Sequence, residues 1–277
     1  MIRMLSAPAT DTQIPHFHRL WLYAFAAAAL AFLVLPTLLI VPMSFTASAF
    51  LEFPPHVWSL RWYRAYLDSQ DWRQATVISL QVATLTMVSA TPVGLAAAYG
   101  TLTCHVRAAR AVAAIVTLPM IMPAVLIGIG LYLVYVPLGL NNSLTGLVLA
   151  HTSLTIPYVY VITLARLKVY EFRQELAAQS LGCTRLQAFL RVTLPQVRTS
   201  VIAAALLAFI FSFDEGVVAY FIATGSESTL PRRMFLALQF GVDPTIAAIS
   251  SCLILLTTGV AIASYGLQGR AGEQRMA

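Results

Sequence analysis

The sequence predicts an all-α membrane protein with several transmembrane helices. Of its 277 residues, 59% are hydrophobic and only 10% are charged, and the mean hydropathy is +0.78. A soluble domain has about 25% charged residues, so this chain cannot cover a soluble globule of its size. Its apolar residues also gather in runs of about 20, the length of a helix that crosses a bilayer. These observations exclude an ordinary soluble enzyme, a disordered chain and a repeat solenoid.

Six apolar runs predict six membrane spans. The first, residues 20–43, follows a polar tail but exceeds the roughly 7–15 apolar residues of a signal peptide, so we interpret it as a retained helix. The other five are expected at residues 74–102, 111–136, 144–164, 201–223 and 244–267. We therefore expect residues 20–267 to form one six-helix transmembrane domain, with short tails at 1–19 and 268–277.

The basic residues predict the orientation of these spans. Six spans place both termini on one side, and Lys and Arg concentrate in cytoplasmic loops. Of the 17 basic residues, twelve fall on the side of the termini. The five on the other side are Arg61, Arg64, Arg73, Arg232 and Arg233. We therefore expect both termini in the cytoplasm and a lipid bilayer around the spans. Because the basic residues form no cluster, the net charge of +6 does not indicate a nucleic-acid partner.

The inner loop between the fourth and fifth spans, residues 166–198, is too long for a simple turn. Ala177 and Ala178 give a helix a smooth flank, and Gly182 can adopt a positive φ that ends this helix. Thr184 can cap a second helix, and Pro195 is expected to stop it before the fifth span. The predicted helix-turn-helix suits a groove on a cytoplasmic protein, although an amphipathic pair lying on the membrane without a partner is the alternative.

This loop carries a motif. Residues 175–182 read Glu-Leu-Ala-Ala-Gln-Ser-Leu-Gly, and Val-Thr-Leu-Pro follows at 192–195. The pattern resembles the EAA loop of ABC importer permeases, the binding-protein-dependent inner-membrane component family. Leu176 stands at the position of the motif's glutamate, with Glu175 one residue earlier. By this resemblance, the residues that couple the chain to an ATPase are Glu175, Ala177, Ala178, Gly182, Leu194 and Pro195.

Further segments are similar to the same family, including Leu118–Pro123 and Phe211–Glu215, and the run most resembles its spermidine/putrescine-type permeases. Ala124 departs from the acidic residue that such relatives often have there. The resemblance implies a type I ABC importer fold, in a multi-pass protein of the bacterial inner membrane. It also implies three kinds of partner: a second homologous permease subunit, two ATP-binding subunits and a periplasmic or extracellular substrate-binding protein.

The chain itself has no Gly-x4-Gly-Lys-Ser/Thr phosphate loop. We therefore expect it to be a transport subunit that is not an enzyme and binds no cofactor, with ATP and Mg²⁺ on the partner ATPase. His16 and His18 lack a third ligand, so no metal site is predicted.

Asp214 and Glu215 lie near the middle of the fifth predicted span. A charge at the bilayer centre costs about 2.5–3.5 kcal/mol on insertion scales, so such residues usually face a cavity. Adjacent residues on a helix point in different directions, and Gly216 allows a close backbone approach or a bend. The functional interpretation is that one carboxylate contacts an amine of the passing substrate. The structural alternative is a pair satisfied by neighbouring helices.

Tyr132 and His151 complete the predicted substrate path. A tyrosine ring can stack on a cation, although packing is the more common role of such residues. The expected substrate is a small cationic solute, with a polyamine as first choice. An amino-acid derivative or an opine-like amine remains open. A different class, an ion-coupled secondary transporter that uses Asp214 or Glu215 as a proton relay, is the rival hypothesis.

Overall fold

The computed structural model describes residues 19–104, 106–223, 225–241, 243–255 and 258. In these ranges the regular structure is helical, apart from one isolated β-bridge. The chain forms two compact units. One comprises residues 69–239, and the other joins residues 1–68 to residues 240–277. The all-α prediction is thus confirmed for the described part of the chain.

The two-segment unit begins with α2 (Leu20–Met43), whose bounds equal those of the first predicted span. None of its residues is buried, as expected of a helix that faces lipid. The following loop is held by a bridge between Thr46 and Trp58 and leads into α3 (Arg61–Asp68). After residue 240, the described part of the sixth predicted span is a short apolar helix, Thr245–Leu255. Most of the rest of that span, residues 256–257 and 259–267, and both predicted tails, except residue 19, lie outside the described residues.

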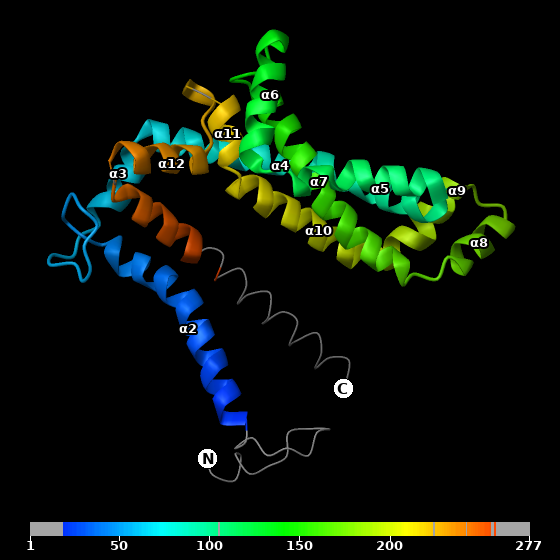
Figure 1. Cartoon of the computed structure of the whole chain (residues 1–277), viewed down its shortest axis with the longest axis horizontal. Coiled ribbons are helices and arrows are strands. Elements are labelled where there is room, and N and C mark those ends of the chain that lie inside the picture. The colour runs from blue at the N-terminus through cyan, green and yellow to red at the C-terminus, as the bar shows by residue number, and fades with distance from the viewer. Residues whose placement is uncertain (1–18, 105, 224, 242, 256–257, 259–277) are drawn as a thin grey trace. The chain divides into compact units, whose positions relative to one another are not determined.

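Three long helices form the core of the other unit: α4 (Gln70–Thr103), α7 (Leu144–Lys168) and α10 (Leu194–Asp214). They pack pairwise against one another (Figure 1). Ser89 bonds Thr152 at 2.7 Å, and further along both helices Thr101 bonds Tyr160 at 3.2 Å, so α4 and α7 run parallel. Arg166 donates to the Gln196 carbonyl, which makes α10 antiparallel to α7. These relative directions agree with the predicted second, fourth and fifth spans.

Small residues allow this close packing. Gly94 of α4 faces α7 so closely that an added Cβ would lie 2.7 Å from Cβ of Val159. Val159 and two alanines of α10, Ala204 and Ala208, are fully buried together. In a membrane, the hydrophobic effect does not drive helices together, and their association depends on close van der Waals packing. Small residues such as these allow that packing and so favour contact between the helices at these positions.

The third predicted span is not one straight helix, which corrects the prediction. The chain forms α5 (Val106–Ile121) and α6 (Ala124–Leu138), with a bend of 104° between them. Pro123 precedes α6 and lacks the N–H that would continue α5, and a proline ring also clashes with the carbonyl four residues earlier. The break therefore follows from a residue that hydropathy alone does not weigh.

The fifth predicted span is also interrupted. α10 ends at Asp214, and a short α11 (Val217–Ile222) follows after Glu215 and Gly216. The predicted outer loop between the fifth and sixth spans then contains a helix, α12 (Leu230–Phe240). Four helices in the described part are long and apolar enough to cross a membrane, or five if α5 and α6 form one span. The count of six spans stays a prediction.

We predict that Gly94→Ala destabilises the α4–α7 interface by about 1–3 kcal/mol, because the new methyl group must displace Val159 or the backbone near it. The measurement is the thermal unfolding midpoint of the purified protein in detergent. Gly100→Ala in the same helix is the control, since its Cβ meets no atom within 4 Å. A midpoint for Gly94→Ala equal to that of the control contradicts the prediction.

Candidate functional site

The loop after α7 folds into the predicted helix-turn-helix, which we call the elbow (residues 169–193). It consists of α8 (Arg173–Ser180), a turn, α9 (Arg185–Ala188) and a π-helical turn, Phe189–Thr193. Gly182 has φ +93° in the turn, a conformation that residues with a side chain rarely adopt. The predicted use of Gly182 as a helix terminator is therefore confirmed.

Thr184 caps α9 as predicted. Its hydroxyl accepts the Gln187 N–H at 3.3 Å, and the Gln187 side chain accepts the Thr184 N–H at 3.0 Å, a reciprocal capping box. The expected role of Pro195 is wrong, because the helix does not stop there. The chain stays helical from Arg185 to Asp214. Pro195 lies in the first turn of α10, directly after the π-helical turn, where a missing N–H is tolerated.

Glu175 lies at the centre of the elbow and is 3% exposed. Its Oε1 accepts a short hydrogen bond from the Tyr99 hydroxyl of α4, and its Oε2 accepts one from the Thr193 hydroxyl at 2.5 Å. The Tyr170 hydroxyl lies 3.2 Å from the Thr193 oxygen. A buried carboxylate costs free energy unless it is hydrogen-bonded, and these hydroxyls meet that requirement. Glu175 therefore joins α8 to the π-helical turn and to the end of α4.

The opposite side of the elbow is exposed and apolar. Leu176, which stands at the motif's glutamate position, points away from Glu175 because adjacent helical residues differ by about 100°. Leu181 at the turn is 88% exposed, and Leu186 of α9 is exposed as well. Of the other predicted coupling residues, Ala177, Gly182 and Pro195 are exposed, and Ala178 and Leu194 are half-buried.

The helix break separates the two predicted acidic residues. Asp214 ends α10 and is exposed. Glu215 is half-buried, and its Oε1 accepts the Val218 N–H at 2.8 Å, so it satisfies a free donor at the start of α11. Gly216 lies against α12, where an added Cβ would be 3.0 Å from the Pro231 Cβ. The predicted bend and close backbone approach at Gly216 are confirmed, whereas the continuous helix through this pair is wrong.

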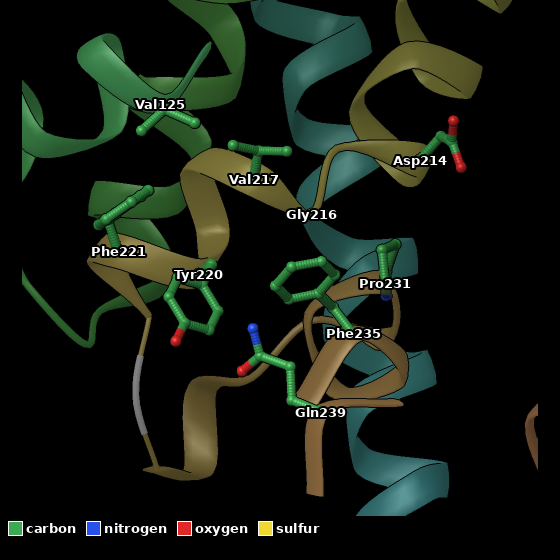
Figure 2. A pocket seen from close by; sticks show the side chains of 9 residues that line it. All are labelled: Val125, Asp214, Gly216, Val217, Tyr220, Phe221, Pro231, Phe235 and Gln239. Carbon is green, nitrogen blue, oxygen red and sulfur yellow. The ribbon is translucent and has the colours of Figure 1, made fainter. Parts of the chain in front are cut away.

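A cavity of about 490 Å³ opens at this break. Figure 2 shows its aromatic walls and the residues around it. Tyr220 and Phe235 meet edge to face, with ring centroids 5.5 Å apart. Asp214 stands at the edge of the cavity, with its carboxylate directed away from the two rings. Glu215 lines a separate, smaller cavity of about 110 Å³ instead, together with Tyr158.

The other two predicted path residues lie elsewhere. Tyr132 is an exposed residue of α6 and lines neither cavity. His151 is 1% exposed, and its Nδ1 lies 2.9 Å from the Ser212 hydroxyl of α10. A histidine held between two packed helices positions them and does not face the cavity at Asp214. The aromatic residues Tyr99, Tyr220 and Phe235 were not predicted, because no motif distinguishes them from other rings in apolar runs.

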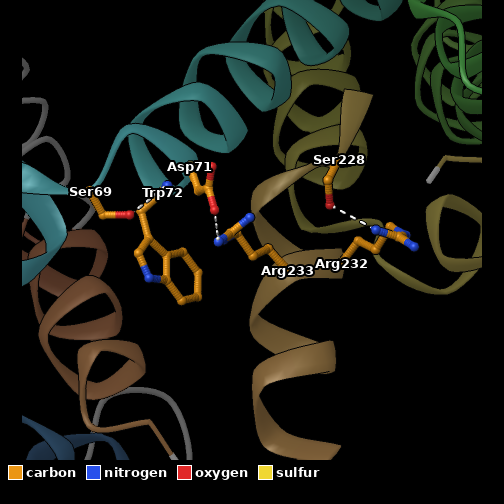
Figure 3. Close-up of polar contacts among 6 residues, drawn as sticks. All are labelled: Ser69, Asp71, Trp72, Ser228, Arg232 and Arg233. Carbon is orange, nitrogen blue, oxygen red and sulfur yellow. Dashed lines mark hydrogen bonds and ion pairs between the residues drawn. The ribbon is translucent and has the colours of Figure 1, made fainter. Parts of the chain in front are cut away.

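α12 is anchored to the start of α4, at the end opposite the elbow (Figure 3). Arg233 pairs with Asp71 at 2.7 Å and lies over the Trp72 ring at 5.1 Å. Arg232 is 8% exposed and donates to the Ser228 hydroxyl at 3.0 Å. Burial lowers the pKa of this guanidinium, since a low-dielectric surrounding disfavours its charge. The predicted inner and outer loops thus lie at opposite ends of α4.

The described part of the chain is thus a bundle of long apolar helices with a broken span and an exposed elbow, as expected of a membrane permease subunit. Residues 90–273 match the family described as "Binding-protein-dependent transport system inner membrane component". The chain belongs to this family and is a permease subunit of an ABC importer.

Two curated relatives and one solved structure support this assignment. The chain is 30% identical over 267 residues to the putrescine transport system permease protein PotI of Escherichia coli (strain K12), covering 92% of this chain and 93% of the relative. It is 27% identical over 242 residues to the spermidine/putrescine transport system permease protein PotC of Haemophilus influenzae, with coverages of 87% and 93%. A bacterial ABC transporter involved in alginate import has the same fold, with a TM-score of 0.71, 13% identity, and coverages of 92% and 96%.

We predict that Thr184→Ala weakens the start of α9. Loss of a threonine cap costs about 0.5–2 kcal/mol, so amide hydrogens of residues 185–189 should exchange several-fold faster. Hydrogen–deuterium exchange with mass spectrometry measures this. Ser180→Ala is the control, because the Ser180 hydroxyl bonds only the Leu176 carbonyl within its own helix. Unchanged protection of α9 in Thr184→Ala would show that the capping box does not hold the elbow.

Proposed function

We propose that this chain forms half of the translocation path for a small cationic solute, specifically a polyamine of the putrescine or spermidine type. The observation that carries the proposal is the Asp214 carboxylate. It is exposed at a helix break inside an apolar bundle, at the edge of a cavity walled by Tyr220 and Phe235. A carboxylate attracts an ammonium group, and aromatic faces favour cations and aliphatic chains alike. The named function of the relatives, putrescine and spermidine transport, supports the same substrate class.

Asp214 and Glu215 have different roles in this proposal. Glu215 holds the start of α11 through the Val218 N–H, so part of its hydrogen-bonding capacity is committed to the fold. Asp214 ends α10 and keeps its carboxylate on the exposed side. In this proposal, Asp214 is therefore the residue that contacts the solute, and Glu215 stabilises the helix break between α10 and α11.

The proposed assembly contains a second homologous permease subunit, two ATP-binding subunits that carry ATP and Mg²⁺, and an external substrate-binding protein. A solved alginate ABC transporter is described in complex with its bound periplasmic protein, which supports the last partner for an importer of this fold. The proposed setting is the bacterial inner membrane, with six spans and both termini in the cytoplasm. The antiparallel arrangement of α10 against α4 and α7 supports this topology.

The elbow is the proposed contact with the ATPase. Its exposed leucines, Leu176, Leu181 and Leu186, form an apolar surface that suits a groove on a cytoplasmic partner. Closure of the ATPase dimer would then displace the elbow, and the attached helices would switch the path between inward-facing and outward-facing states. ATP dependence of uptake separates this mechanism from an ion-coupled carrier, which would need no elbow.

We predict that Asp214→Asn raises the KM for putrescine uptake by about tenfold, the loss expected when one charged partner of an ammonium group is removed. Glu215→Gln should leave KM within about twofold of wild type, because its side-chain oxygen can still cap α11. Uptake into proteoliposomes that contain the whole complex, at equal permease levels, measures both. An unchanged KM in Asp214→Asn removes Asp214 from the path. Competition by a zwitterionic amino acid, but not by spermidine, would instead support an amino-acid derivative as substrate.

We predict that a cysteine introduced by Leu181→Cys cross-links to the ATPase subunit, because Leu181 is the most exposed large apolar side chain of the elbow. The background should have Cys104, Cys183 and Cys252 replaced by serine, since these are free thiols. The matched control is Leu238→Cys on α12, which is also exposed but lies in the predicted outer loop. Cross-linking at the control position and none at Leu181→Cys in an active complex would contradict the proposed orientation.

A further inference from the structure

The elbow packs against the membrane helices through an apolar cluster that includes Tyr170, Phe172 and Phe189 of the elbow. A cavity of about 420 Å³ lies beside the contact between the elbow and the end of α4, lined by Leu102 and Thr103 of α4 and by Glu175 and Arg185 of the elbow. Packing against this last turn of α4 is therefore incomplete. A displaced elbow can drag α4 only through the contacts that remain, so the side chains that make them decide how tightly the two parts move together.

The Tyr99 hydroxyl of α4 makes polar contacts with two helices of the elbow. The hydroxyl donates to the buried Glu175 carboxylate of α8 and accepts from the Arg185 Nε of α9 at 3.3 Å. One oxygen atom of α4 thus connects both helices of the elbow. A hydrogen bond to an ionised group is roughly twice as strong as one between neutral groups, and burial of the carboxylate strengthens it further.

The Tyr99 ring contacts the remaining segments. Its centroid lies 4.7 Å from that of Phe189 in an edge-on arrangement, and 6.3 Å from that of Phe172. The Arg185 guanidinium lies over the same ring at 5.5 Å. Phe172 precedes α8, and Phe189 begins the π-helical turn. Tyr99 therefore touches the segment before α8, α8 itself, α9 and the π-helical turn.

We infer that Tyr99 is the positioning residue that fastens the elbow to α4, so that displacement of the elbow by the ATPase moves this helix. The inference rests on the proposed contact between the elbow and the ATPase. Because Tyr99 joins the elbow at four places while a cavity leaves part of the surface unfilled, its loss would let the elbow move without α4. ATP hydrolysis would continue, and fewer solute molecules would be carried for each ATP.

The test is the number of ATP molecules hydrolysed per putrescine imported, measured with the whole complex in proteoliposomes. Tyr99→Phe removes the hydroxyl and keeps the ring, and it should raise this ratio by roughly tenfold, the effect that loss of one hydrogen bond to a charged group can produce. Tyr160→Phe is the matched control. The Tyr160 hydroxyl bonds Thr101 of the same end of α4 but does not touch the elbow, so the ratio should not change. A purely structural loss would lower both rates together or reduce the amount of complex, and leave the ratio unaltered.

A second measurement keeps the inference testable if Tyr99→Phe assembles poorly. Thr193→Val removes the other hydroxyl that donates to Glu175 and changes no residue of α4. It should raise the ratio of ATP hydrolysed to putrescine imported less than Tyr99→Phe does.

The outcomes separate this inference from the proposed function. Leu181→Cys cross-linking to the ATPase together with a normal ratio in Tyr99→Phe overturns the role of Tyr99 and leaves the coupling elbow in place. If Leu181→Cys does not cross-link to the ATPase when Tyr99 is unchanged, the proposed function itself is contradicted, whatever the ratio of ATP to putrescine.

Discussion

The burial of one carboxylate constrains the rest of the elbow and the end of α4. Glu175 cannot be buried without donors, and two hydroxyls supply them, from Tyr99 on α4 and from Thr193 in the π-helical turn. Each donor comes from a different segment, so satisfying the carboxylate fixes α8 against both. A π-helical turn contains one residue more than an α-helical turn, which changes the direction of the side chains that follow by about 100°. In this turn, Thr193 lies on the inward side. The apolar residues Leu176 and Leu181 consequently face outward, toward any partner.

α4 connects the two ends of its unit. It has 34 residues, which gives a length of about 51 Å, enough to span a bilayer with its headgroups. Near its end, Tyr99 holds the elbow. Near its start, Ser79 accepts the Leu230 N–H at 2.7 Å in a buried position and Asp71 pairs with Arg233, so α12 is held there. In the proposed mechanism, α4 is the helix through which displacement of the elbow would reach α12.

The parts of this structure that could be predicted from the sequence are those set by local chemistry. The bounds of α2, the positive φ of Gly182 and the Thr184 cap each depend on nearby residues alone. The helix breaks were harder, because hydropathy averages over the single residue that matters, such as Pro123. Tyr99 could not be found at all. Its function depends on Glu175, which is 76 residues away, and only the folded chain brings the two together.

The break after Asp214 shows why an acidic pair inside an apolar bundle need not be redundant. In a continuous helix, both carboxylates would be desolvated beside backbone groups that are already paired, and each would need an outside partner. Ending α10 at Asp214 exposes free N–H groups at the start of α11, and the Glu215 carboxylate satisfies one of them. The same break exposes the Asp214 carboxylate beside the aromatic cavity, and Pro231 of α12 packs against Gly216 at this point. One interruption of the helix thus gives the two neighbours separate surroundings, and it places the break beside α12, a helix that is anchored to the start of α4.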